Sequence, residues 1–146
     1  MPSYFEKERI LFMRLWHFKL IPVLPRQQLL GQWRECCLIA KELKEKGTPN
    51  HILVDPVINY ASEHFIAYCR MVSDEMRSRG YHVNTSSLEQ YLDRPFYVSC
   101  TDDQLFPGWH TDDYLRQCYY NLEEKHDRGG MTDEEWNKIE VLYNER

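Results

Sequence analysis

Apolar residues recur at helical spacing over residues 25–46. Steps of three or four residues separate the apolar positions Leu29, Trp33, Cys36, Ala40 and Leu43. This spacing places them on one stripe of an α-helix, which is the face expected to meet the core. Pro25 suits the first turn of such a helix, and Gly47 suits its end. The pattern therefore predicts a first long helix over residues 25–46.

A second long helix is predicted over residues 55–79. Asp55 and Pro56 form an N-cap and first-turn pair, and Gly80 is a typical residue at which a helix ends. The apolar positions expected to face the core are Ile58, Phe65, Tyr68, Cys69, Val72 and Met76.

Capping residues mark two further helices in the last third of the chain. Thr111 begins a helix predicted over residues 111–127. Thr132, with Glu135 three residues later, fits a capping box for a helix over residues 132–143. Gly129-Gly130 is expected to end the first of these two helices.

The stretch between the second and third long helices is less regular. A short helix is expected over residues 86–92, and residues 96–98 are the only strand candidate. With so few strand signals, the predicted fold class is all-α, a single compact domain of about four helices. The predicted core contains Leu29, Trp33, Cys37, Phe65, Tyr68, Val72, Leu115 and Leu122.

Cysteine usage and hydropathy indicate a cytoplasmic protein. The chain has five cysteines, an odd number, and no C-x-x-C motif, so all five are expected to be free thiols in a reducing compartment. The six histidines do not fall at ligand spacings beside the cysteines, so no metal site is expected. No apolar run reaches the length of about 18 residues that a membrane span needs, and the N-terminus lacks the pattern of a secretory signal.

The net charge of −5 is unevenly distributed. Residues 13–100 carry 11 Lys and Arg against 9 Asp and Glu, whereas residues 101–146 carry 5 against 12. An acidic surface repels a phosphate backbone. Any nucleic-acid site is therefore expected in the first two thirds of the chain, and the acidic last third is a candidate surface for a protein partner.

A polar flank runs beside the apolar stripe of the first predicted helix. On a helical wheel its members are Gln28, Gly31, Gln32 and Glu35. Gly31 costs about 1 kcal/mol of helix stability relative to Ala, which is tolerated where something must approach the backbone. Two interpretations stay open: a polar pocket beside the core, or a solvated Glu35 beside a glycine that only eases packing.

The segment from Met13 to Glu35 resembles a known family. The matching residues are Met13-Arg14-Leu15-Trp16-His17, Leu20-Ile21-Pro22, Leu24 through Gln32 and Arg34-Glu35. They resemble the start of the pyrimidine-dimer DNA glycosylase family, the phage endonuclease V type, and in particular its bacterial branch of short proteins beginning MRLWH. Weaker matches lie at Asn59-Tyr60, at Glu75-Met76 and from Arg79 to Tyr81.

The resemblance implies a helical DNA repair glycosylase with AP-lyase activity and no cofactor. Such an enzyme flips a base out of damaged double-stranded DNA or acts at an abasic site. An N-terminal α-amine attacks the sugar C1′ carbon, a Schiff base forms, and β-elimination cuts the strand. An α-amine suits this role because its ordinary pKa of about 8 leaves some of it unprotonated at neutral pH. Glu35 falls on the family's catalytic glutamate.

The resemblance also points to residues that contact DNA. Arg34 falls on a DNA-contacting arginine, and Arg14 falls near the arginine that follows the family's nucleophile. The full set of expected DNA-binding residues is Arg14, Arg34, Arg26, Gln28 and Gln32. Candidates for the side chain that wedges the duplex open are Trp33, Trp16 and His17.

The chain departs from the family pattern at several positions. Gln28 stands where the family has a histidine, and Leu38 stands where it has a further arginine. The characterised enzymes are basic and begin with a threonine amine, whereas this chain is acidic and has no such threonine. These departures bear on pyrimidine-dimer specificity more than on chemistry that uses a glutamate and an amine.

The first 12 residues precede the resemblance and are expected to be an N-terminal extension. Lys7-Glu8 can be encoded by AAG GAG, which is similar to a bacterial ribosome-binding site, so residues 1–12 are a candidate translated leader. The natural nucleophile would then be the amine of Met13, in a helical domain over residues 13–146. In the longer form, removal of Met1 exposes Pro2, an alternative N-terminal amine.

Two other functions are compatible with the sequence. One is a non-catalytic helical binding module of the same fold that contacts a protein partner. The other is a lyase or hydrolase that acts on a small nucleotide or aldehyde, for which weak duplex affinity is no obstacle. The missing arginines favour the binding module, and the retained Arg34 and Glu35 favour the glycosylase.

Overall fold

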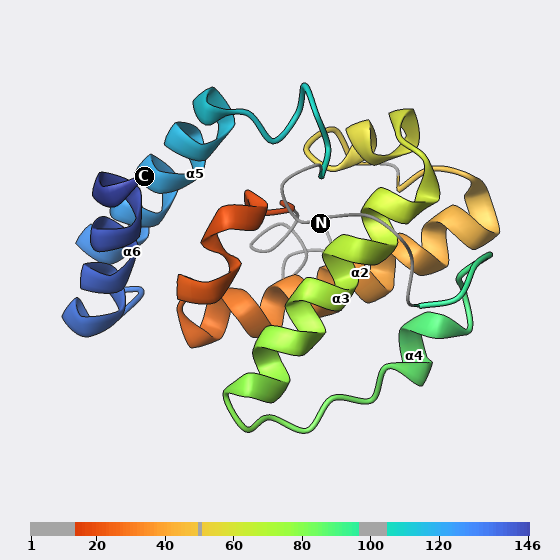
Figure 1. The fold of residues 1–146 in the computed structure, drawn as a ribbon, viewed down its shortest axis with the longest axis horizontal. Helices are drawn as coiled ribbons and strands as arrows, with labels where there is room; N and C mark the ends of the chain where they lie inside the picture. Colours follow the sequence, from red (N-terminus) through yellow and green to blue (C-terminus); the bar gives the residue numbers. More distant parts are fainter. Residues whose placement is uncertain (1–13, 50, 97–104) are drawn as a thin grey trace, which may run out of the picture.

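The computed structural model describes residues 14–49, 51–96 and 105–146, and all of its regular elements there are helical (Figure 1). In chain order they are η1 (Phe18–Val23), α2 (Arg26–Lys46), η2 (Asp55–Asn59), α3 (Ser62–Ser78), α4 (Ser86–Glu89), α5 (Asp112–Asp127) and α6 (Asp133–Glu145), where η denotes a 3-10 helix. The all-α prediction is confirmed. No helix in the described residues is long and apolar enough to cross a bilayer.

Two helical pairs and a connecting segment make up the architecture. Helices α2 and α3 pack against each other, and α5 and α6 form a second pair at the other end of the molecule (Figure 1). The short element η1 contacts both α3 and α6, so it joins the two pairs. The segment that carries the family resemblance is thus central to the fold.

Helix α2 follows the sequence prediction closely. It begins at Arg26, directly after Pro25, and ends at Lys46. Gly47 has a left-handed backbone with φ of 77°, and its N–H donates to the Leu43 carbonyl oxygen at 3.1 Å. A glycine adopts this conformation without the steric cost that a Cβ atom imposes, which explains why the helix ends there.

The single helix predicted over residues 55–79 is wrong, because the structure divides it into η2 and α3. Tyr60 is extended, with φ of −120° and ψ of 155°, and it interrupts the helical backbone. Its hydroxyl donates to the Pro107 carbonyl oxygen at 2.6 Å. A continuous helix would move the Tyr60 side chain away from this partner. The same break leaves Ile58 52% exposed, although it was expected in the core.

Residues 20–22 lie within the 3-10 helix η1. The guanidinium group of Arg79, the residue directly after α3, binds carbonyl groups at the end of this element. It donates to the Leu24 carbonyl oxygen at 2.8 Å and to the Pro22 carbonyl oxygen at 3.2 Å. A partner on a distant helix therefore satisfies carbonyl groups that a short 3-10 turn leaves free.

The two helices predicted in the last third of the chain are confirmed as α5 and α6. The Thr111 side chain accepts from the Tyr114 N–H at the start of α5, and Thr132 and Glu135 form the predicted capping box of α6. Aromatic rings join the two helices, with the rings of Tyr119 and Tyr143 stacked at 3.9 Å between centroids.

Most of the predicted core is buried. Leu29, Phe65, Tyr68, Val72, Leu115 and Leu122 lie inside, whereas Trp33 and Cys37 are only partly buried against that core. The predicted short helix 86–92 is shorter, ending at Glu89. Of the strand candidate 96–98, only Phe96 lies within the described residues, and it forms a bend. The four described cysteines are free, and Cys100 lies outside the described residues.

Candidate active site around residues 14–18

The polar flank of α2 is buried. Gln28 is 4% exposed, and Gln32 and Glu35 are each 1% exposed. Gly31 lies inside with them. The interpretation of Glu35 as a solvated helix residue is therefore wrong, and a carboxyl group lies within a polar stripe beside the core. The side-chain oxygen of Gln28 has no hydrogen-bond partner among the described residues.

The amide of Gln32 binds the backbone of the chain segment that enters η1. Its Nε2 donates to the Arg14 carbonyl oxygen at 2.8 Å, and its Oε1 accepts from the Trp16 N–H at 2.8 Å. These two bonds give residues 14–16 the kind of partner that a neighbouring strand would supply. The segment is thereby fixed against the middle of α2.

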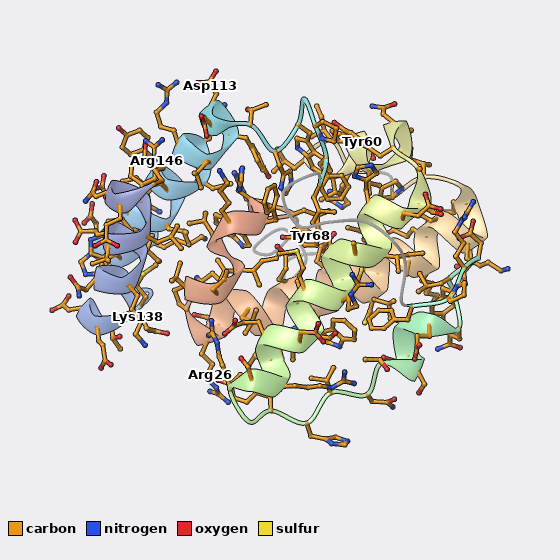
Figure 2. All side chains as sticks on the ribbon, in the orientation of Figure 1. Arg26, Tyr60, Tyr68, Asp113, Lys138 and Arg146 are labelled. Atoms are coloured by element: carbon orange, nitrogen blue, oxygen red, sulfur yellow. The ribbon has the colours of Figure 1, made fainter. Side chains whose placement is uncertain are left out.

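Two tyrosine hydroxyls bind the same segment from other helices. Tyr68 of α3 lies in the middle of the molecule (Figure 2), with its hydroxyl 2.5 Å from the Trp16 carbonyl oxygen and 2.9 Å from Gln32 Oε1. Tyr114 of α5 donates to the Leu15 carbonyl oxygen at 2.7 Å. Burial raises the pKa of both phenols, so both hydroxyls keep the proton that they donate.

Two neutral histidines, His17 and His110, also accept hydrogen bonds from the backbone here. His110 Nδ1 accepts from the Phe18 N–H at 3.1 Å, and His17 Nδ1 accepts from the Lys19 N–H at 3.1 Å. A nitrogen that accepts carries no proton, so in both rings the proton is on Nε2. His17 Nε2 accordingly donates to the His110 carbonyl oxygen at 3.1 Å.

Burial keeps both imidazoles uncharged. It lowers the pKa of His17 from 6.5 to about 4 and the pKa of His110 from 6.5 to about 2. The neighbouring His17 also lowers the pKa of His110. Both rings are therefore neutral near pH 7, as their hydrogen bonds require.

The charged candidates for DNA contact lie in different environments. Arg34 and Arg26 are exposed on α2, and Figure 2 shows Arg26 at the edge of the molecule. Arg14 is half-buried, with its guanidinium carbon 5.2 Å from the centroid of the Trp16 ring. Gln28 and Gln32 are buried, and the Gln32 amide is committed to the backbone of residues 14–16.

The candidate wedge residues also differ in how deeply they are buried. Trp16 and His17 lie inside, with 4% and 1% of their surface exposed, and Trp16 belongs to the hydrophobic core. Trp33 is half-buried on α2. The two candidate amines, on Met13 and Pro2, lie outside the described residues. No group of three or more potential metal ligands occurs in the described parts of the chain.

Sequence reasoning missed the partners that hold residues 14–18 from a distance. Tyr68 was predicted only as core, and His110 and Tyr114 were not singled out. Their contacts with residues 14–18 span between 52 and 99 positions of the chain. No local pattern signals such contacts.

Comparison with known proteins places this segment in a family. A family model described as pyrimidine dimer DNA glycosylase matches residues 13–89, which is more than half of the 146 residues. No curated protein and no solved structure matches the chain significantly. The matched region contains the buried Glu35 and the segment bound by Gln32. The chain therefore belongs to the pyrimidine dimer DNA glycosylase family.

Proposed function

We propose that this protein is a DNA glycosylase with AP-lyase activity that uses an N-terminal amine as its nucleophile. The amine of Met13, in a chain that begins there, attacks C1′ of the damaged nucleotide, and the glycosidic bond breaks as the base leaves with a proton. The resulting Schiff base loses a proton from C2′, and the 3′ phosphate leaves by β-elimination. Glu35 transfers the protons in these steps.

The observation that carries the proposal is the position of Arg14 relative to Glu35. The Arg14 carbonyl oxygen lies 2.8 Å from Gln32 Nε2, and Glu35 is on the same helix three residues further along. Residues three apart are neighbours on a helical surface. The residue before Arg14 lies at a Cα distance of about 3.8 Å from it, and we infer that its amine acts with that carboxyl group.

The path of the chain supports Glu35 over Gln28 as the partner of the amine. From Trp16, held by Gln32, the chain returns through η1 to Arg26 at the start of α2. Gln32 lies six residues after Arg26, so this return covers about 9 Å along the axis of α2. Between Trp16 and Arg26 the chain thus runs antiparallel to α2, so Arg14 is at the end of this path that is farther from the start of α2.

DNA contacts are proposed on the solvent-facing side of α2. At 100° per residue, Arg26, Arg34, Lys41 and Lys44 fall within one quarter of the helical wheel, and all four are exposed. On the same wheel Glu35 falls about 100–180° away from these positions, so the basic face lies on the helix that carries Glu35 but does not adjoin the buried carboxyl group. Gln32 takes a positioning role instead of a DNA-binding one, because its amide is buried and bonded to residues 14–16.

The start of the chain decides whether the nucleophile exists. In the 146-residue form Met13 is an internal amide and has no free amine, so that form depends on Pro2 as an alternative amine. The family match begins at residue 13, which supports Met13 as the functional N-terminus. We therefore expect the form that begins at Met13 to be the active one.

Borohydride trapping on duplex DNA with a single abasic site tests this proposal. The 146-residue form and the Met13-start form are compared side by side. We expect the Met13-start form to give a covalent protein–DNA adduct and the longer form to give little. Glu35→Gln should slow strand cleavage by about 10²- to 10⁴-fold, the usual effect of losing a general acid or base. Glu45→Gln, an exposed change on the same helix, is the matched control.

Two outcomes would overturn the proposal. If neither form is trapped, the chain has no amine nucleophile, and the non-catalytic binding module replaces the lyase. If Glu35→Gln cleaves as fast as Glu45→Gln, the buried carboxyl group has no part in the proton transfers.

A further inference from the structure

Part of the hydrogen bonding to residues 14–18 comes from outside the family match. The matched region ends at residue 89, yet His110 and Tyr114 bind the backbone of Phe18 and Leu15 at 3.1 and 2.7 Å. The backbone of His110 also accepts from the ring of His17. The chain after the matched region therefore helps to hold the segment that leads to the proposed nucleophile.

The region around His110 is itself anchored to α3 and to the segment before it. The Phe106 N–H donates to His64 Nδ1 at 3.0 Å, and the Tyr60 hydroxyl donates to the Pro107 carbonyl oxygen at 2.6 Å. These bonds fix residues 106–110 at two points. Because its own support is fixed, the His110 ring holds Phe18 in a defined position.

Ring packing also fixes the orientation of His110. Its ring lies parallel to that of Phe18, at 5.9 Å between centroids with 1° between planes. Phe106 and Trp109 each pack against it, with centroids 4.9 Å away. A ring held on several sides cannot turn to exchange its two nitrogens, so Nδ1 stays directed at the Phe18 N–H.

His110 has no other side-chain hydrogen bond among the described residues. Its Nε2–H donor is buried and has no partner there, and the ring is 7% exposed. A buried unpaired donor destabilises a fold, by about 1–3 kcal/mol. Among the described residues, the one hydrogen bond of the ring is to the backbone N–H of Phe18, within the 14–18 segment.

We propose that His110 is a positioning residue for the N-terminal nucleophile. Its Nδ1 holds Phe18, its carbonyl oxygen holds His17, and residues 14–18 in turn place the amine at position 13 relative to Glu35. The inference rests on the proposed function, because it needs that amine to act as the nucleophile. It goes further by assigning a role to a residue beyond the matched region.

The test compares two substitutions in the Met13-start form. In His110→Asn the side-chain oxygen falls near the position of Nδ1 and can still accept from the Phe18 N–H, whereas His110→Phe keeps an aromatic ring but removes the acceptor. Single-turnover borohydride trapping is measured across DNA concentrations from pH 6 to 9. His82→Asn, at an exposed position, is the control.

We expect His110→Phe to lower the maximal trapping rate by about 10- to 100-fold, because small misplacements of a reacting group have effects of this size. The DNA concentration at half-maximal rate should stay within about twofold, since His110 is not on the basic face of α2 and phosphate contacts dominate DNA affinity. His110→Asn should recover most of the rate. The pH profile of the maximal rate should keep its shape in both variants.

Each alternative result is informative. A folded His110→Phe that traps at the parent rate overturns the inference while leaving the proposed function intact. A His110→Asn as slow as a folded His110→Phe also overturns it, because the acceptor would then not be the operative group. If His110→Phe does not fold, His110→Leu replaces it, since that change also removes the acceptor for the Phe18 N–H, and an unchanged rate there overturns the inference. A parent that is never trapped defeats the proposed function itself.

Discussion

The side-chain amide of Gln32 binds the backbone of Arg14, with Nε2 2.8 Å from its carbonyl oxygen. The same amide accepts from the Trp16 N–H through Oε1, so one buried side chain provides both a donor and an acceptor to one segment. This pairing brings the proposed nucleophile end of the chain to the helix that carries Glu35, and it leads to the first prediction.

Gln32→Met should destabilise the protein by about 2–4 kcal/mol. The change keeps the side-chain length but removes the bonds to Arg14 and Trp16, and buried backbone groups without partners cost about 1–3 kcal/mol each. Urea unfolding measures the loss, and hydrogen exchange should show faster exchange at the Trp16 amide. Gln27→Met, five positions earlier on α2 and exposed, is the control. Equal stability of the two variants would contradict the assigned hydrogen bonds.

Stability should fall below about pH 6.5 because of His17 and His110. Their pKa values are about 4 and about 2 in the folded protein, against 6.5 in an unfolded chain. The unfolded state therefore binds more protons as the pH falls, which weakens the fold. The stabilisation is complete above pH 6.5, and each histidine loses about 1.4 kcal/mol per pH unit below it.

Chemical unfolding at pH 7.5 and pH 5 measures this effect. In His110→Asn the decrease between the two pH values should be smaller by about one histidine's share, close to 2 kcal/mol over the 1.5 units below pH 6.5. His82→Asn, which replaces an exposed histidine, should keep the parent's dependence. A parent-like slope in His110→Asn would show that the ring takes up its proton as easily in the folded protein as in the unfolded chain.

Arg34→Gln should weaken DNA binding without changing the fold. Arg34 is exposed on the basic face of α2, and removing one phosphate contact lowers the salt dependence of log Kd by about one unit of slope. Fluorescence anisotropy with an abasic duplex at several salt concentrations measures both quantities. Arg116→Gln, on the acidic α5, is the control and should leave the slope unchanged. If Arg116→Gln lowers the slope and Arg34→Gln does not, the DNA-binding surface lies on the C-terminal helices instead.

The thiols of the native protein should react slowly with a disulfide reagent at pH 8. Cys36, Cys69 and Cys118 are fully buried, and burial raises the pKa of Cys37 to about 11, so little thiolate forms. Time-resolved labelling followed by peptide mapping checks each site. All four should react at once in denaturant. Rapid labelling of Cys37 in the native protein would show that its thiol is more acidic than its surroundings imply.

The sequence alone determined the helices whose ends depend on neighbouring residues. Gly47 ends α2 through its own left-handed backbone, and Thr132 with Glu135 begins α6 through bonds within one turn. Such caps act over three or four positions, so they can be recognised without knowing the fold. The resemblance in residues 13–35 identified both the family and Glu35 from the sequence alone, because the matching residues are nearly contiguous.

Only the tertiary structure decided where the helix predicted over residues 55–79 breaks and what surrounds Glu35. Tyr60 leaves the helical backbone where its hydroxyl bonds to Pro107, 47 positions away, and a helical pattern contains no trace of that partner. The burial of Glu35 and the contacts of His110 with Phe18 depend on helices that meet only after the chain has folded. Local hydrogen bonds and apolar spacing predict elements, whereas side chains distant in sequence determine which polar groups are buried together and which backbone they hold.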